Sequence, residues 1–517
     1  MKPRSSLLFV SLALAPMPAI FAAPAPQKLP RATQNELEKL LAAPQIQSGH
    51  VGISVRALGE AASPASFAAK PFDGAQTPTL FARNEQKRFV PASNMKLFTA
   101  GYVLQALGAK TRLKTRVFAA KAQFLGENVW PKSVPEPFVV TLVGGGDPSL
   151  STSDLDALAS RVAPLLKAPL IVRAQNSLEG DALNAENNGA RYPDGWTLDD
   201  ALWYYGAPVT GLSVNRNHVD LTVKAAPKAG EAPEISASPE APLDFLNLVN
   251  TVENGETRLG FERGDRFSPL GERLTISGQI AVGKSQTEGV AVPDPREWAR
   301  QIFADALKKH GAQVVEPQAP FAATEQSEIG SHESPEIGVL MQRFLKNSDN
   351  LYGELLLRVA APKTPVSSEK SGAALVVSTG RAQNAHRAMS GWLFDSQSLR
   401  FSDGSGLSRY NLLTPRAVSG LLAQMQTATD GAAFYEALPV AGVDGTLKNR
   451  MKTGAATNNA RAKTGTFSIV NCLSGYVTTR DGKRLAVAIL TNGVESGEAA
   501  RQWQGQVFEA LANARWK

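Results

Sequence analysis

Cysteine and histidine, the residues behind many metal and redox sites, are scarce in this sequence. Its 517 residues include one cysteine, Cys472, so no disulfide can form within the chain. Cys472 lies in an apolar, strand-like run, where we expect a buried free thiol. The five histidines are spread over the chain with no two at metal-ligand spacing: His50, His218, His310, His332 and His386. This scatter disfavours a zinc site and a Ser-His-Asp triad.

Dense runs of positive charge are also missing. The 54 Lys and Arg residues outnumber the 47 Asp and Glu residues, which gives a net charge of +7 and a pI near 9.3. Without a basic run, nucleic acid is not an expected partner. A solvated basic surface is the simplest interpretation, and contact with an anionic surface such as cell-wall polymer or lipid is the alternative. The length and the 43% hydrophobic fraction indicate a soluble globular protein of two or three domains.

Long apolar stretches are absent except near the N-terminus. Lys2 and Arg4 precede an apolar stretch over 7–21, and small alanines follow it. This order is typical of a secretory signal peptide, so we expect residues 1–22 to be one. The protein would then be exported, to the periplasm or another extracytoplasmic space, with at most a peripheral attachment to membrane or cell wall. A retained N-terminal anchor is the alternative, although the stretch is short for a membrane span.

Secondary-structure signals distinguish the two ends of the chain from its middle. At the ends we expect helices over 34–42, 93–107, 337–345, 351–360 and 498–514, and strands over 50–57, 79–83, 462–470, 473–479 and 484–491. In the middle we expect short strands such as 138–143 and 219–223, and helices over 153–165 and 295–309. The ends therefore predict a helix-flanked antiparallel sheet, and the middle predicts inserted domains of mixed α and β structure.

Three short motifs indicate the chemistry. They are Ser93-x-x-Lys96, Ser348-Asp349-Asn350 and Lys463-Thr464-Gly465, in that order. Ser93 and Lys96 are three residues apart at a predicted helix start, so their side chains share one face and can touch. The helix N-terminus favours a developing alkoxide, and a desolvated lysine can act as a neutral base. We therefore predict that Ser93 is a nucleophile and Lys96 its base.

Each motif has a second copy in less suitable surroundings. The copies are Ser367-x-x-Lys370 after a proline-rich loop, Ser213-Val214-Asn215 between strand signals, and Lys452-Thr453-Gly454 before polar residues without a strand pattern. Ser348 instead lies in a break between two predicted helices, and Lys463 leads directly into a predicted edge strand. Order and context, rather than any motif alone, support the prediction.

A further pattern points elsewhere. Residues 278–285 match the phosphate-binding loop Gly-x-x-x-x-Gly-Lys-Ser letter for letter. That loop must join a strand to a helix whose N-terminus holds the phosphates. Here residues 274–282 alternate as a strand, and prolines follow at 293 and 295. We expect an ordinary hairpin instead.

With its three motifs the chain resembles the D-alanyl-D-alanine carboxypeptidase/endopeptidases, the class C low-molecular-mass penicillin-binding proteins. Ser93 and Ser348 are 255 residues apart. This family carries two inserted domains there, whereas class A β-lactamases have only a short segment. Residues 144–148, 205–209 and 403–409 also look like signatures of the family.

The resemblance implies an α/β (α+β) fold. It consists of a β-lactamase/transpeptidase-like domain, an antiparallel sheet flanked by helices, plus inserted mixed α/β domains. We expect the penicillin-binding peptidase domain over 30–110 and 331–517, an inserted domain over 111–150 and 215–330, and a second domain nested in it over 151–214.

The resemblance also implies an activity. The protein would be a serine DD-peptidase that hydrolyses D-alanyl-D-alanine bonds of peptidoglycan stem peptides, with D-alanyl cross-links as a further substrate, and β-lactam antibiotics would acylate it. Ser93 would attack the carbonyl and Lys96 would take the hydroxyl proton. Ser348 would pass a proton to the leaving amine, and Asn350 would hold the substrate amide. No metal or organic cofactor is implied.

The third motif is expected to bind the end of the substrate. Lys463 would supply positive charge, and Thr464, Gly465 and Thr466 would bind the terminal carboxylate. The backbone N–H groups of Ser93 and Thr466 would form the oxyanion hole.

A side pocket is implied as well. Arg409, Ser468 and Asp200 fall where the family recognises the free end of a diaminopimelate side chain. Arg409 could bind its carboxylate and Asp200 its ammonium. Plain surface or turn positions are the alternative for these residues.

Two other functions are compatible with parts of the sequence. One is a β-lactamase or esterase of the same fold, but nothing about 35 residues after Asn350 looks like the glutamate that class A enzymes use for deacylation. That absence favours slow release of penicillin. The other is a catalytically silent wall-binding protein, which would not need the paired Ser93 and Lys96.

Overall fold

The computed structural model describes residues 28–60, 77–124, 130, 133–176, 191–264, 273–317, 319–323, 326–362, 375–376, 380–393 and 399–516. The expected signal peptide over 1–22 and the second Ser-x-x-Lys motif at Ser367 lie outside these ranges. Within them, no helix has both the length and the apolar character needed to cross a membrane.

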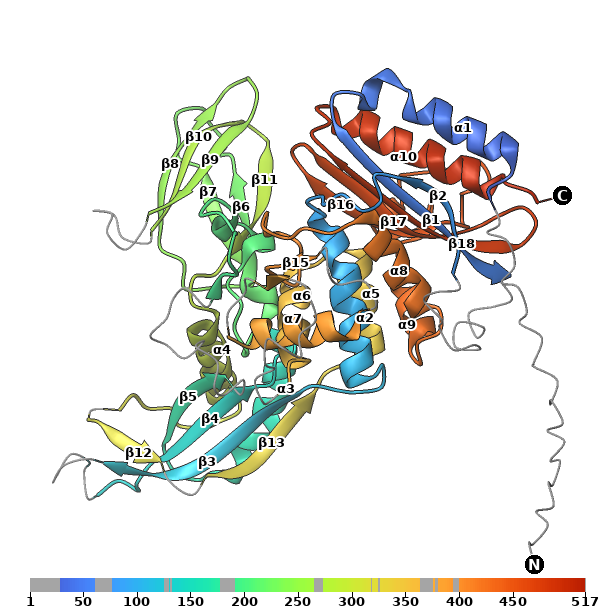
Figure 1. Cartoon of the computed structure of the whole chain (residues 1–517). Helices are drawn as coiled ribbons and strands as arrows, with labels where there is room; N and C mark the ends of the chain where they lie inside the picture. Colours follow the sequence, from blue (N-terminus) through green and yellow to red (C-terminus); the bar gives the residue numbers. More distant parts are fainter. Residues whose placement is uncertain are drawn as a thin grey trace, which may run out of the picture.

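The two ends of the chain form one antiparallel sheet (Figure 1). Its strands, in spatial order, are β16 (Arg461–Phe467), β17 (Val470–Thr478), β18 (Lys483–Asn492), β1 (His50–Glu60) and β2 (Thr79–Arg83). β1 pairs with β18 from His50 opposite Asn492, so segments from both ends of the chain meet inside the sheet. β17 and β18 form the predicted hairpin, and its turn contains Gly482 at a φ of 83°.

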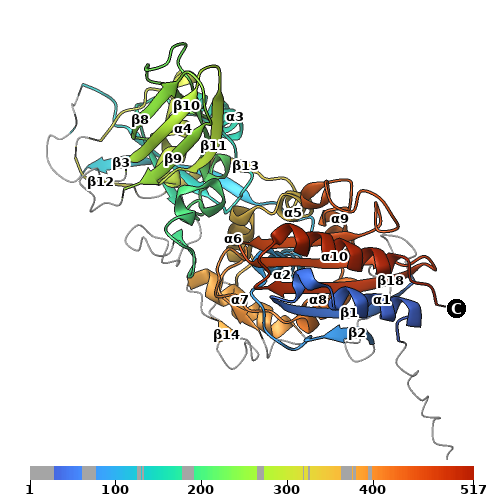
Figure 2. The ribbon, with the colours of Figure 1, turned by 90° about the horizontal axis from the view of Figure 1, so that it is seen from above.

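Helices cover both faces of this sheet, which explains why its central strands are apolar on both sides (Figure 2). α1 (Arg31–Leu41) and α10 (Gly497–Ala512) lie side by side on one face, where Trp503 Nε1 donates to the carbonyl of Leu40 at 2.8 Å. The other face carries α2 (Met95–Leu107), α5 (Ile337–Lys346), α6 (Asn350–Val359), α7 (Gly380–Trp392), α8 (Pro415–Met425) and α9 (Gly431–Ala437). β14 (Leu375–Val376) and β15 (Arg400–Phe401) pair with each other. The expected fold, a helix-flanked antiparallel sheet with inserted α/β parts, is confirmed.

The core helix of this domain is α2, which carries the first motif. Its residues from Met95 to Leu104 are buried on every side. A helix that is apolar all round belongs in a domain core rather than on its surface. Lys96 is therefore the exceptional residue of this helix, because it is a basic side chain held in an apolar environment.

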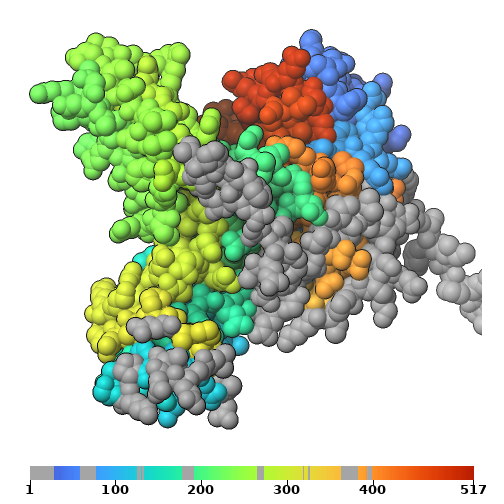
Figure 3. Space-filling view, turned by 90° about the vertical axis from the view of Figure 1, so that its left-hand side faces the viewer, coloured from blue at the N-terminus to red at the C-terminus, as the bar shows by residue number. Residues whose placement is uncertain are grey.

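The middle of the chain forms a separate region beside the domain that contains both chain ends (Figure 3). One sheet contains β3 (Lys114–Phe124), β4 (Phe138–Gly144), β5 (Leu170–Asn176), β12 (Phe321–Ala323) and β13 (Ser327–Glu333), with α3 (Thr152–Val162) and α4 (Pro295–Lys309) packed against it. β3 leaves the domain of the chain ends and β13 returns to it, and the two strands pair from Lys114 opposite Glu333. The inserted region is thus joined to that domain by a paired two-stranded stalk.

Two smaller sheets complete the inserted region. β11 (Ser285–Ala291), β6 (His218–Lys224) and β7 (Glu234–Ser238) form one, and β8 (Phe245–Val252), β10 (Leu274–Ala281) and β9 (Arg258–Arg263) form the other. Their apolar faces share a core of their own, which includes Leu221, Ile276 and Val290.

Strand pairing groups the inserted segments differently from the expected ranges. β5 lies within 151–214, the range expected for the nested domain, yet it pairs in parallel with β4 through the crossover helix α3. The segment that forms sheets separate from the one containing β4 and β5 runs instead from β6 to β11. The domain boundaries themselves stay a prediction.

The hairpin expected after residue 274 is wrong. β10 is the central strand of its sheet, so both of its edges are already occupied by β8 and β9. The chain turns at Gly283, and β11 pairs with β6 in the neighbouring sheet. A strand rather than a helix follows residues 278–285, so the arrangement that a phosphate-binding loop requires is not formed there.

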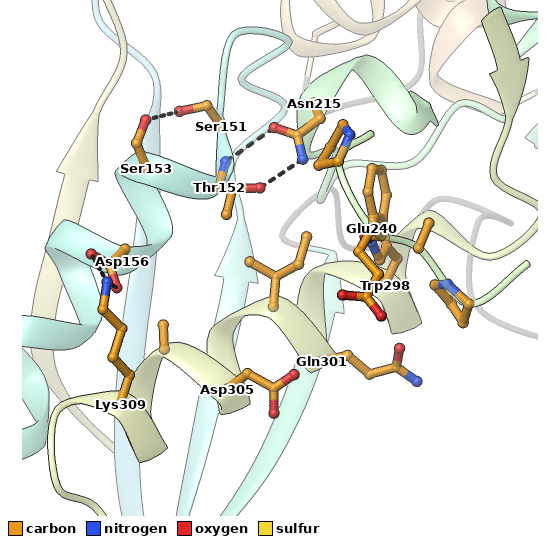
Figure 4. Close-up of a pocket in the computed structure, with 15 residues that line it drawn as sticks. Ser151, Thr152, Ser153, Asp156, Asn215, Glu240, Trp298, Gln301, Asp305 and Lys309 are labelled. Atoms are coloured by element: carbon orange, nitrogen blue, oxygen red, sulfur yellow. Dashed lines mark hydrogen bonds and ion pairs between the residues drawn. The ribbon is translucent and has the colours of Figure 1, made fainter. Parts of the chain in front are cut away.

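The inserted region also contains a groove of about 930 Å³ between α3, α4 and residues 239–242 (Figure 4). Several of its polar side chains already pair with one another. Asn215 donates to Thr152 Oγ1 at 2.8 Å, and Lys309 Nζ lies 3.0 Å from Asp156 Oδ1. The groove shares no residue with the three sequence motifs.

Candidate active site

The serine of the first motif lies where a short turn enters α2. Ser93 is in a 3₁₀ turn over Ala92–Asn94 and is partly exposed, whereas Lys96, one turn further on, is buried. Lys96 Nζ lies 2.9 Å from Ser93 Oγ. The predicted contact between the two side chains is thus present at the helix start.

Lys96 has two further partners, and both are acceptors. Its Nζ donates to Asn350 Oδ1 and to the carbonyl of Ser405, each at 2.6 Å. A neutral amine has two N–H groups and one lone pair. If the two N–H groups serve Asn350 and Ser405, the lone pair is left to face the hydroxyl of Ser93.

The electrostatics of the buried amine favour this neutral form. Burial lowers the pKa of Lys96 to about 8, although Asp403, Asp349 and Glu354 act in the opposite direction. Burial also lowers the pKa of Lys463 well below its usual value, and the neighbouring Lys96 lowers it further. Two buried amines this close cannot both be charged without a large cost in free energy.

The second motif occupies the break between α5 and α6, as predicted. Ser348 has a φ of 59°, a left-handed conformation that serine adopts rarely and that the tight turn between the two helices requires here. Its hydroxyl accepts from Lys463 Nζ at 2.9 Å. Asn350 begins α6 and donates through Nδ2 to the carbonyl of Tyr205 at 2.8 Å, so a loop of the inserted region supports this motif.

Asp349 connects the same motif to the inserted region a second time. Its side chain is buried, caps α6 through the N–H of Tyr352, and accepts from Arg216 Nε at 2.6 Å. Arg216 precedes β6 and is far from Asp349 in sequence. Its contact with Asp349 could not be predicted from the sequence, which showed only the motif Ser213-Val214-Asn215 beside Arg216.

The third motif lies on β16, the edge strand of the sheet. Asn94 Nδ2 donates to the carbonyl of Lys463 at 2.9 Å, which holds the strand against the turn containing Ser93. A Cβ on Gly465 would lie 2.5 Å from the carbonyl oxygen of Pro91, so only glycine allows this close approach. The predicted edge strand is present, and it lies against the turn that contains Ser93.

A fourth segment, 403–408, completes the cluster. Gly406 has a φ of 83°, and a Cβ there would lie 2.0 Å from the carbonyl oxygen of Ala92. Asp403 is fully buried and accepts hydrogen bonds from the N–H groups of Gly406 and Ser408 and from the side chains of Trp196, Ser405 and Asn411. The sequence showed this segment only as a signature, without its contact to Lys96.

The residues expected to bind the substrate lie on β16, in the turn after it, and in the two separate segments that contain Arg409 and Asp200. Thr464 Oγ1 donates to Thr446, and Thr466 and Ser468 are exposed. Arg409 lies 3.2 Å from Asp200 Oδ2 and about 5.0 Å from the ring centre of Phe467.

Asp200 is therefore not an isolated anion. It is buried, and the N–H and hydroxyl of Thr197 both donate to its Oδ2, at 3.0 and 2.7 Å. The structure brings Arg409 and Asp200 together as an ion pair, with the exposed guanidinium outermost.

The second copies of the motifs do not form a comparable cluster. Ser213 is buried and donates to the carbonyl of Thr210 within its own turn. Lys452-Thr453-Gly454 lies in a loop between helices and β16 rather than on a strand. Cys472 is buried on β17, as expected, and burial raises the pKa of its thiol to about 12.

Comparison with known proteins identifies the family of the chain. The family model described as the D-Ala-D-Ala carboxypeptidase 3 (S13) family matches residues 34–514. The D-alanyl-D-alanine carboxypeptidase of Actinomadura sp. (strain R39) is 30% identical over 534 residues, which cover 98% of this chain and 90% of the relative. The D-alanyl-D-alanine carboxypeptidase DacB of Haemophilus influenzae is 24% identical over 79% of this chain and 81% of its own length.

Solved structures agree in fold. The crystal structure of penicillin binding protein 4 (DacB) from Haemophilus influenzae has a TM-score of 0.69 at 20% identity, covering 92% of this chain and 99% of that one. A structure of the same protein complexed with a β-lactam has a TM-score of 0.64 at 20% identity, with coverages of 91% and 98%. The family match and the 30% identical relative decide the identity: the chain belongs to the D-Ala-D-Ala carboxypeptidase S13 family and is a serine-type carboxypeptidase of that family.

Proposed function

We propose that this carboxypeptidase cleaves the D-alanyl-D-alanine bond of peptidoglycan stem peptides through Ser93, with Lys96 as general base. The observation that carries the proposal is the set of contacts around Lys96 Nζ. Two acceptors at 2.6 Å occupy its N–H groups, and Ser93 Oγ stands at 2.9 Å. A general base must lie within hydrogen-bond reach of the proton that it removes, and this one does.

Acylation follows from this geometry. Ser93 Oγ attacks the carbonyl carbon as its proton moves to Lys96 Nζ. The N–H groups of Ser93 and Thr466 then stabilise the oxyanion, a contribution of about 3–4 kcal/mol for one such donor in other enzymes. Ser348 gives its hydroxyl proton to the leaving nitrogen and regains one that comes from Lys96, directly or through Lys463, so that Lys96 is neutral again. The C–N bond breaks, and D-alanine departs.

Deacylation reverses the proton transfers. Water attacks the Ser93 ester, and Lys96 accepts the water proton. Lys96 then returns a proton to Ser93 Oγ as the ester bond breaks. Asn350 would hold the amide of the acyl group through the second N–H of its Nδ2, because Oδ1 serves Lys96 and the first N–H donates to the carbonyl of Tyr205. β-Lactams would form the same ester on Ser93, and the hydrolysis of that ester would be slow.

The terminal carboxylate of the substrate would bind along β16. Lys463 supplies positive charge below it, and the Thr466 hydroxyl offers a hydrogen bond beside Gly465. The Thr464 hydroxyl would turn from Thr446 to the carboxylate. Both threonines lie on the part of β16 that is not fully buried, which supports their access to a ligand.

The side-chain end of a diaminopimelate residue would meet Arg409, Asp200 and Ser468. That end is zwitterionic, with one ammonium and one carboxylate. The Arg409–Asp200 ion pair presents complementary charges side by side, and the exposed guanidinium would meet the carboxylate first. Ser468 lies in the turn after β16 and is exposed.

The cellular site follows from the substrate. Peptidoglycan lies outside the cytoplasmic membrane, so we propose that residues 1–22 are a signal peptide and that the mature enzyme acts in an extracytoplasmic space. Its basic net charge of +7 suits contact with anionic wall polymers.

The decisive experiment compares Ser93→Ala with Ser367→Ala, the serine of the second Ser-x-x-Lys motif. Release of D-alanine from a pentapeptide muropeptide and the mass of the intact protein after penicillin treatment are measured. We expect wild type and Ser367→Ala to release D-alanine and gain one penicillin adduct, and Ser93→Ala to do neither. Unchanged D-alanine release by Ser93→Ala would overturn the proposal, and rapid penicillin turnover without an adduct would favour a β-lactamase. Running monomeric and cross-linked muropeptides side by side tests cleavage of cross-links.

A further inference from the structure

A buried carboxylate that none of the motifs includes lies behind the catalytic lysine. Glu354 is on α6, one turn after Asn350, and is completely buried. Its Oε1 accepts from the N–H groups of Gly404 and Ser405, both at 2.8 Å. Among the residues that the structure describes, its Oε2 has no hydrogen-bond partner. Burying an acidic group with an unsatisfied oxygen costs free energy, so its presence needs an explanation.

The peptide that Glu354 holds leads directly to Lys96. The carbonyl of Ser405 is one of the two acceptors for Lys96 Nζ, and the carbonyl of Gly404 accepts from Thr99 Oγ1 at 2.6 Å. The 404–405 segment is therefore fixed on its N–H side by Glu354 and on its carbonyl side by α2. If the segment moved, Lys96 would keep only Asn350 as an acceptor, and one contact would not fix the direction of its lone pair toward Ser93.

Hydrogen bonding alone does not require a carboxylic acid here, since any acceptor would satisfy two N–H groups. A carboxylate adds charge to the surroundings of Lys96, and it is one of three acids, with Asp403 and Asp349, that favour the protonated amine. Around Glu354 itself, the charged neighbours are Asp403 and Arg358. Burial, assisted by Asp403, raises the pKa of Glu354 to about 7.

We propose that Glu354 is a positioning residue for the catalytic base: it fixes the Ser405 carbonyl that orients Lys96 toward Ser93, and its ionisation adjusts the charge felt by that amine. The proposal rests on the proposed role of Lys96 as base. Glu354 contacts neither Ser93 nor the position expected for the substrate, so it acts only through the 404–405 segment and through its charge.

Two substitutions separate the two parts of this role. Glu354→Gln keeps an oxygen for both N–H groups but removes the charge, whereas Glu354→Ala removes both. Glu509 provides a matched control, because it also accepts from two consecutive N–H groups, those of Ala455 and Ala456, on the opposite face of the sheet. The control variant is therefore Glu509→Gln.

The measurement is the rate of Ser93 acylation by a fluorescent penicillin between pH 5 and pH 10, on the full mature enzyme. The rate should rise with pH as Lys96 loses its proton. Without the Glu354 charge the protonated amine is less stable, so Glu354→Gln should move this rise to lower pH and keep most of the rate at high pH. Glu354→Ala should lower the rate by up to about 100-fold, as small misplacements of catalytic groups do. Glu509→Gln should leave the profile unchanged.

The outcomes distinguish this inference from the function on which it rests. An unchanged pH profile in Glu354→Gln would overturn it, and so would a wild-type acylation rate in Glu354→Ala. If Glu354→Ala does not fold, the profile of Glu354→Gln alone decides. A wild-type enzyme whose rate does not depend on pH, or a Ser93→Ala variant that is still acylated, would instead refute the proposed function.

Discussion

Replacing Arg216 with alanine should slow acylation of Ser93, although Arg216 belongs to the inserted region and touches no reacting atom. Three consecutive residues without the freedom of glycine, Asn215, Arg216 and Asn217, have φ values of 48°, 59° and 57°. Each left-handed residue costs about 1–2 kcal/mol. Asn217 helps to hold the turn by donating to the carbonyl of Pro208 at 2.8 Å. This costly turn presents Arg216 to Asp349, which lies between Ser348 and Asn350 of the second motif.

The magnitude follows from the burial of the pair. The Asp349 side chain is 3% exposed and that of Arg216 is 25% exposed, with 2.6 Å between Nε and Oδ2. Breaking a fully buried pair costs about 3–5 kcal/mol and an exposed one under about 1 kcal/mol, so about 2 kcal/mol suits this intermediate case. If the whole loss appears in the transition state, acylation slows by about 30-fold.

The assay is stopped-flow acylation by a fluorescent penicillin, with far-UV circular dichroism to check folding. Arg112→Ala is the matched control. Arg112 forms an ion pair with Glu336 at 3.3 Å next to the stalk, but both side chains are more than 40% exposed. That variant should acylate like wild type. A folded Arg216→Ala enzyme that also acylates at the wild-type rate would refute the idea that the inserted region supports the second motif.

Three further predictions concern the peptidase domain. Below the Lys96 pKa of about 8, the acylation rate should fall tenfold per pH unit, because only the neutral amine accepts the Ser93 proton; a rate that is constant from pH 6 to 9 would contradict this. Gly465→Ala should slow β-lactam acylation by about 10-fold or more, because its Cβ would press on the Pro91 carbonyl, at an overpacking cost of about 1–3 kcal/mol. Gly505→Ala, on α10, where a Cβ would meet no atom closer than 3.4 Å, serves as control and should retain the wild-type rate. Cys472 should react with an aromatic disulfide reagent only after unfolding in urea, and rapid labelling of the native enzyme would show that it is accessible.

The sequence was most informative where local pattern decides structure. α4 was predicted over 295–309 and has those bounds, and the three C-terminal strands were each placed within a few residues. Alternation, caps and turn residues lie close together in sequence, so they can be recognised without knowledge of the fold. The same holds for Ser93 and Lys96, which are neighbours on one helix turn.

The pairing of strands that are distant in sequence could not be predicted in the same way. β4 pairs with β5 in parallel and β11 lies beside β6 because of which sheet edges are free, and local residue patterns carry no information about free edges. The site shows a similar limit. Tyr205 and Ser405 contribute backbone carbonyls, which every residue has, and Glu354 is distant in sequence from the segment that it holds.

The pairing of β1 with β18 also has a consequence for how the protein forms. Residue 50 must find residue 492 before the peptidase sheet can close, so this domain has contacts of very high sequence separation, which slow folding. Among the described residues, the strands between 114 and 333 pair only with one another, and they can assemble as soon as they emerge. We therefore expect the inserted region to fold first and to bring the two halves of the peptidase domain together through its stalk. On that order of events, Ser93 meets Lys463 last, and a chain that is still folding does not have the three motifs assembled.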